Sequence, residues 1–96
     1  MLIDKGVSVN EVITLKLTSG EEIVAKLIEE TDTYYKLSKP MVIGMGQAGP
    51  GLMPYLFTVN PDKEVKLSKV TVTVAEATDK TFADQFVQST TGIKLI

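Results

Sequence analysis

The residues best suited to chemistry are aromatic and basic, and they lie close together in one short segment. Tyr34, Tyr35 and Lys36 are consecutive, and Lys39 follows shortly afterwards. Tyrosine rings can stack on bases and lysines can neutralise phosphates, so the segment could bind single-stranded nucleic acid. In an ordinary strand, the two tyrosines would instead point to opposite faces, one into the core and one outward. The sequence alone leaves both interpretations open.

A second group of lysines, Lys63, Lys66 and Lys69, recurs at every third residue. Such a row could form a basic edge that contacts phosphates. Lysines are also common on exposed strands, where they keep a sheet edge soluble. The three lysines therefore indicate either a binding edge or a solubility device.

Two other patterns do not support a site. The segment 44–49 matches the glycine spacing of a dinucleotide-binding loop, but Pro50 and Gly51 follow where that mechanism requires a helix N-terminus. We predict a loop there instead. Glu29, Glu30 and Asp32 could ligate a hard cation, yet neighbouring strand residues point to opposite faces. We therefore expect a solvated turn and no metal site.

The composition excludes most catalytic chemistry. The chain has no cysteine and no histidine, and all ten of its basic residues are lysines. Catalytic triads, thiolate metal sites and histidine bases are thus excluded, and we expect neither an enzyme nor a cofactor. With twelve carboxylates the net charge is −2, so any binding of nucleic acid must depend on a local lysine cluster.

The hydrophobic pattern predicts one small, mainly β domain of 96 residues. Ile13, Leu15 and Leu17 alternate with polar residues, as in a half-buried strand. The predicted elements are a lead-in over 1–10, strands over 12–17, 22–30, 34–38, 52–59 and 70–74, a glycine loop over 44–51, a helix over 79–91 and a tail over 92–96. Residues 12–75 would then form a five-stranded, strongly bent barrel.

The predicted helix has one apolar stripe. Phe82, Ala83, Phe86 and Val87 recur at helical spacing, so this stripe should dock the helix on the barrel. Thr81 and Asp84 have the spacing of a capping box, which predicts the start of the helix.

The segment from Val12 to Ile43 resembles the first sequence motif of the Sm-like family. Leu15, Leu17 and Gly20 stand where that motif has its hydrophobic strand and glycine, and Asp32 stands at its acidic turn position. The stretches 19–26 and 89–93 and the Lys39–Pro40 step look like Sm-like proteins of cyanophages and marine metagenomes. The chain departs from the family at Lys36, where asparagine is usual, at 68–69, where Arg-Gly is usual, and in having its helix last.

The resemblance implies a homo-oligomeric ring that binds single-stranded RNA or DNA in nucleic-acid processing during phage infection of a host cell. In the family, the fourth strand of one subunit pairs with the fifth strand of its neighbour. The implied interface residues are Leu52, Tyr55, Phe57, Val59, Val70, Val72 and Val74. The implied nucleic-acid-binding residues, in loops that line the ring's centre, are Asp32, Tyr34, Tyr35, Lys36, Lys66 and Lys69.

An alternative function is a structural or protein-interaction module, for instance in virion assembly or host takeover, that binds an unknown protein partner. The acidic balance and the absence of arginine favour this alternative. The chain shows no leader pattern and no apolar run of membrane-spanning length. We therefore expect a cytoplasmic protein without a membrane partner, located in the host cytoplasm if a phage encodes it.

Overall fold

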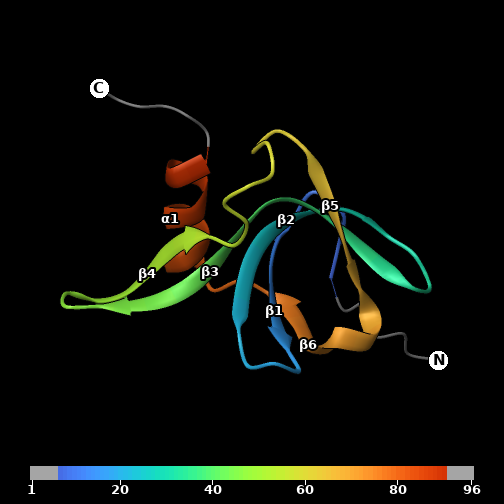
Figure 1. Cartoon of the computed structure of the whole chain (residues 1–96), viewed down its shortest axis with the longest axis horizontal. Coiled ribbons are helices and arrows are strands. Elements are labelled where there is room, and N and C mark those ends of the chain that lie inside the picture. The colour runs from blue at the N-terminus through green and yellow to red at the C-terminus, as the bar shows by residue number, and fades with distance from the viewer. Residues whose placement is uncertain (1–6, 91–96) are drawn as a thin grey trace.

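The computed structural model describes residues 7–90, and it shows a mainly β architecture with one helix at the C-terminal end (Figure 1). Six strands form one antiparallel sheet within that range, whereas the sequence predicted five. The elements are β1 (Val12–Leu17), β2 (Glu22–Glu30), β3 (Tyr34–Gly46), β4 (Gly49–Pro54), β5 (Glu64–Ser68), the short 3₁₀ turn η1 (Lys69–Thr71), β6 (Val72–Ala77) and α1 (Lys80–Thr90).

The core lies on one face of the strongly bent sheet. The predicted alternation in β1 is confirmed, because Ile13, Leu15 and Leu17 are all buried. Ile23, Ala25 and Leu27 of β2 join them, together with Tyr35 and Leu37 of β3. β1 and β2 form a hairpin whose turn contains Gly20 at a φ of 109°, a left-handed conformation that favours glycine.

The long strand β3 organises the rest of the sheet. Its first half, from Tyr34 to Ser38, pairs with β5, and its second half, from Met41 to Gly46, pairs with β4. β4 and β5 thus lie one after the other along the same side of β3, separated in sequence by residues 55–63. The order across the sheet is β4-β3-β2-β1-β6, with β5 paired to β3 beside β4, so β4, β5 and β6 each have a strand neighbour on one side only among residues 7–90. The described sheet is therefore not closed.

Three predicted elements differ from the structure. The predicted glycine loop over 44–51 is wrong, because β3 and β4 run through it as a hairpin that turns at Gln47 and Ala48. The predicted strand over 52–59 is wrong beyond Pro54: the Tyr55 amide makes the last bond to β3, at the Pro40 carbonyl, and residues 56–59 pair with no described strand. The predicted strand over 70–74 is shifted, because Ser68 accepts a hydrogen bond from the Val70 amide and starts a 3₁₀ turn first.

The helix α1 packs against β1 and β2, on the side of the sheet opposite the core (Figure 1). Phe86 is buried as predicted, whereas Val87 stays 45% exposed, so only part of the stripe docks. The predicted capping box is wrong: Asp79 caps the helix, and its Oδ2 accepts a hydrogen bond of 3.2 Å from the Thr81 amide. Asp84 instead forms an ion pair with Lys80.

The predicted tail over 92–96 and most of the lead-in, residues 1–6, lie outside the described residues. Among those that are described, no helix has the length and apolar character needed to cross a membrane.

Candidate nucleic-acid interface

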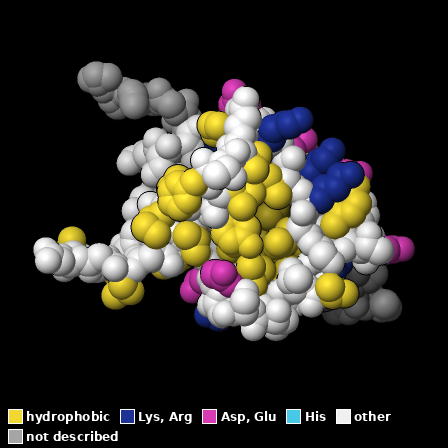
Figure 2. Space-filling view, viewed as in Figure 1, with side chains coloured by type: hydrophobic (Ala, Val, Ile, Leu, Met, Phe, Trp, Pro, Cys, Tyr) yellow, Lys and Arg dark blue, Asp and Glu magenta, His cyan; other side chains and the backbone are white. Residues whose placement is uncertain are grey.

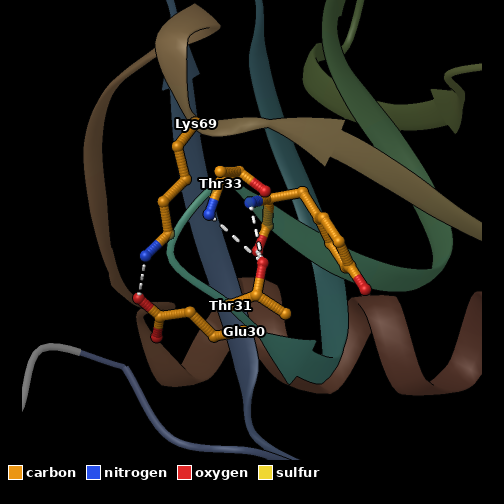
Figure 3. A network of polar contacts seen from close by, with 5 residues as sticks. Glu30, Thr31, Thr33 and Lys69 are labelled. Carbon is orange, nitrogen blue, oxygen red and sulfur yellow. Dashed lines mark hydrogen bonds and ion pairs between the residues drawn. The ribbon is translucent and has the colours of Figure 1, made fainter.

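Two connections that are distant in sequence meet at one end of the sheet (Figure 3). The turn between β2 and β3 contacts the junction of β5 and η1. The Lys69 amide donates a hydrogen bond of 2.8 Å to the Thr33 carbonyl, and Lys69 Nζ lies 2.6 Å from Glu30 Oε2. This junction brings Lys69 next to the turn that carries Asp32.

Thr31 fixes the shape of the turn between β2 and β3. Its hydroxyl oxygen accepts hydrogen bonds from the amides of Thr33 and Tyr34, at 3.2 and 3.1 Å (Figure 3). Its own amide donates to the Tyr34 carbonyl at 2.9 Å. Side-chain hydroxyls that bond to the following backbone are a common means of stabilising turns. The Thr31 hydroxyl, rather than the Asp32 carboxylate, accepts these hydrogen bonds, and Asp32 is exposed at the tip of the turn.

The two tyrosines point to opposite faces of β3. Tyr35 is only 8% exposed and belongs to the core, so its ring is not presented on the outer face. Tyr34 is half-buried, and the ammonium of Lys66 on the neighbouring strand lies 5.0 Å from the centre of its ring. That distance is typical of a cation–π contact. The structure thus brings Tyr34, Lys36 and Lys66 together on the outer face of β3 and β5. It places Tyr35 on the core face, where the Lys69 ammonium lies 5.1 Å from the centre of its ring.

Carboxylates accompany two of the three predicted lysines. Lys36 Nζ lies 3.9 Å from Glu29 Oε1 and 3.8 Å from Glu64 Oε1, and Lys69 is paired with Glu30. The hydrogen bond to Glu30 raises the pKa of Lys69 above its ordinary value. Lys66, by contrast, makes no ion pair with any residue that the structure describes. The outer face is therefore of mixed charge rather than uniformly basic.

Sequence reasoning did not assign these carboxylates to the lysines. Glu64 lies opposite Ser38, and Lys36 lies opposite Lys66, only because β5 pairs with the first half of β3. Cross-strand neighbours come within reach through this register, which a single sequence does not reveal. The row of lysines also separates, because Lys63 precedes β5 and contributes to a hollow elsewhere.

The predicted interface residues fall into two groups. Tyr55 and Val72 pack against the core, and Leu52 is half-buried. The other four are exposed: Phe57 by 79%, Val59 by 40%, Val70 by 83% and Val74 by 49%. Figure 2 shows that hydrophobic side chains gather in the middle of the visible face. Exposed large apolar side chains in such numbers are typical of a surface that contacts a partner.

Within residues 7–90, no three acidic side chains lie close enough together to hold a metal ion. Comparison with models of protein families and with curated proteins found no match for this chain. The candidate site is thus defined by its geometry. It consists of the outer face that carries Tyr34, Lys36 and Lys66, and it lies beside Asp32 in the β2–β3 turn and Lys69 at the start of η1.

Proposed function

We propose that this chain is a non-catalytic assembly protein whose copies associate head to tail into a ring, as in the Sm-like family. In this proposal, β4 of one copy pairs with β6 of the next and so completes the open sheet. The observation that carries the proposal is the difference between the free edge of β4 and the free edge of β6.

The free edge of β4 lacks most of its hydrogen-bond donors. The Tyr55 amide donates to the Pro40 carbonyl, so Met41 and Pro54 form a pair whose own backbone groups point away from each other. Hydrogen-bonded and non-hydrogen-bonded pairs alternate along an antiparallel ladder. The backbone N–H and C=O positions therefore point away from β3 at every second residue of β4, namely Pro50, Leu52 and Pro54. Proline has no N–H, so Leu52 offers the one outward donor among these three positions.

The free edge of β6 keeps its donors. The Thr78 amide donates to the Val12 carbonyl, so the next pair along the ladder, Ile13 and Ala77, is not hydrogen-bonded. Ala77 and, two residues earlier, Ala75 therefore direct both N–H and C=O outward. β6 can donate to the outward carbonyls of β4, whereas two β4 edges facing each other would have a donor only at Leu52.

Unlike edges favour a heterologous contact over a two-fold one. A two-fold dimer through β4 would need that edge to complement itself, which its prolines oppose, and a two-fold dimer through β6 would leave the β4 edge uncovered. Head-to-tail contacts repeat, and they close into a ring when the rotation between copies permits it. The exposed Val74 on β6 and Met53 on β4 would lose apolar surface to water in the same contact.

A second candidate function, binding of single-stranded nucleic acid by the ring, is favoured by Tyr34 and Lys66. Tyr34 presents part of a ring on the outer face, and Lys66 carries a charge that no described carboxylate pairs with. In a ring this pair would recur in every copy, which adds several weak contacts along one strand.

Native mass spectrometry of the full chain tests assembly, and fluorescence anisotropy with labelled oligo(U) and oligo(dT) tests binding. We expect a closed oligomer and saturable binding that weakens steeply between low and physiological salt. Changing Lys66 and Lys36 to Ala should reduce binding by roughly 30-fold, at about 1 kcal/mol for each of the two lost phosphate contacts, without changing the oligomer. Assembly without any binding at low salt would favour the protein-interaction module, and a monomer at every concentration would overturn the assembly proposal.

A further inference from the structure

A partly open hollow of about 250 Å³ lies between the bend of β3, the segment 54–61 and the end of α1. Its wall is apolar and stiff. It includes the rings of Pro40, Pro54 and Pro61 and the side chains of Leu56, Val59 and Val65. Leu56 and Val59 are 37% and 40% exposed, so this apolar surface is accessible from solvent. Proline rings lose little conformational freedom on binding, which favours capture of an apolar group.

Two lysines, Lys39 and Lys63, belong to the same lining. Lys39 Nζ lies 3.3 Å from Asp62 Oδ1 and 3.4 Å from the Pro61 carbonyl oxygen. The Asp62 side chain is 87% exposed, so water screens this pair and another carboxylate can replace it at little cost. Lys63 forms no ion pair with the residues that the structure describes.

The backbone at Lys39 holds this lysine in an uncommon conformation. Its φ is +52°, a left-handed value that is rare outside glycine, and it directly precedes Pro40. Such strain persists only where the surrounding structure enforces it, and it is concentrated at binding positions. Here it places Lys39 in the lining of the hollow.

The size of the hollow limits its ligand. Pockets for cofactors and drug-sized molecules typically start near ~300 Å³, so this smaller hollow suits one large apolar side chain. We propose that it binds an acidic peptide segment of a partner protein, with one aromatic or large aliphatic side chain in the hollow and flanking carboxylates at Lys39 and Lys63. This site adjoins the proposed ring contact at Pro54, but its ligand requires neither ring assembly nor nucleic-acid binding.

The test is a titration of the ¹⁵N-labelled full chain with a pentapeptide that has a central phenylalanine between aspartates. We expect saturable shifts of the amide signals at Val59, Val65 and Thr90. Replacing the central phenylalanine by alanine should weaken binding by at least ~10-fold, because burying such a side chain contributes about 1.5–3 kcal/mol. Lys63→Glu should weaken it about fivefold, while Lys16→Glu on β1 serves as the charge-matched control.

Three results would overturn the proposal. The first is no saturable shift at millimolar peptide, and the second is equal binding of the alanine peptide. The third is equal weakening by Lys63→Glu and Lys16→Glu, which would indicate attraction by net charge alone. Displacement of the peptide by a short oligonucleotide would assign the hollow to nucleic acid instead and would likewise contradict the peptide site.

Discussion

Two stretches of this chain are apolar on both faces, and only one of them is buried. In β2, Ile23 and Leu27 face the core while Val24 on the opposite face is 1% exposed, because α1 packs on that side of the sheet. In the stretch 52–59, Phe57 is 79% exposed and Met53 is 47% exposed. A segment that is apolar on both faces therefore needs a second surface to cover it, and the described chain provides such a surface for β2 alone.

The uncovered stretch is also unusual in its charge. No charged residue occurs from Pro40 to Pro61, a range that contains the whole β3–β4 hairpin tip and β4. Free strand edges are normally protected by charged side chains, by proline or by bulges. Here β4 has proline and no charge, so its edge limits promiscuous pairing while its apolar side chains stay available to a partner.

The largest expected effect contrasts a core residue with a hairpin residue. Leu27→Ala should lower the free energy of unfolding by about 2–5 kcal/mol, because a fully buried side chain leaves a cavity. Met45→Ala, at a side chain 78% exposed, should change it by no more than ~0.5 kcal/mol. Urea denaturation of both variants at one protein concentration measures the contrast. Equal losses would show that Met45 is buried in the folded form, and the uncharged range from Pro40 to Pro61 would then be covered at its hairpin tip.

A second, smaller effect separates association from folding. Ala75→Pro removes an outward N–H of β6 without removing a hydrogen bond to β1. Ala75 lies opposite Leu15, and the backbones of these two residues make no hydrogen bond to each other. Association should weaken by roughly tenfold or more, because a carbonyl of the neighbour is left unpaired. Analytical ultracentrifugation over a dilution series measures this.

Ala75→Gly is the matched control, because it keeps the N–H and removes only a methyl group. It should associate like the parent chain. Unchanged association of the proline variant would exclude β6 as the paired edge.

The smallest expected effect concerns the ion pair of Lys69 with Glu30. A double-mutant cycle with Lys69→Met and Glu30→Gln should give a coupling energy of about 0.5 kcal/mol or less, since both side chains are about one-third exposed. The pKa of Lys69 is raised, so the coupling should be complete below the ordinary lysine pKa and disappear as pH rises through the raised value. Coupling that persists above that pH, or in 1 M salt, would contradict a screened surface pair.

The hydrophobic pattern of the sequence predicted those elements whose structure depends on neighbouring residues along the chain. The alternation of Ile13, Leu15 and Leu17 indicated β1 correctly, and the helical spacing around Phe86 indicated α1. The glycines of 44–51 and Pro50 predict a loop by composition, although paired glycines and edge prolines are compatible with a hairpin. Composition does not distinguish these two outcomes, because the pairing partner decides between them.

The candidate site was predictable in the same limited sense. The opposite orientation of Tyr34 and Tyr35 follows from strand alternation and was one of the two stated interpretations. The ion pairs of Lys36 depend on the register between β3 and β5, which nothing local encodes. The difference between the free edges of β4 and β6 depends on which residues of each strand point their backbone groups outward. The hydrogen bonds at the ends of the two ladders show this in the structure, and the sequence alone does not.

The most direct test of head-to-tail pairing is a mixing experiment with two variants, each blocked at one edge. Val74→Glu charges β6 and Met53→Glu charges β4, and both positions are exposed enough to spare the fold. We predict that each variant alone is monomeric at micromolar concentration in native mass spectrometry. Their mixture should give a 1:1 heterodimer, because one intact β4 can still pair with one intact β6. Two monomers in the mixture, or rings from either variant alone, would contradict the account.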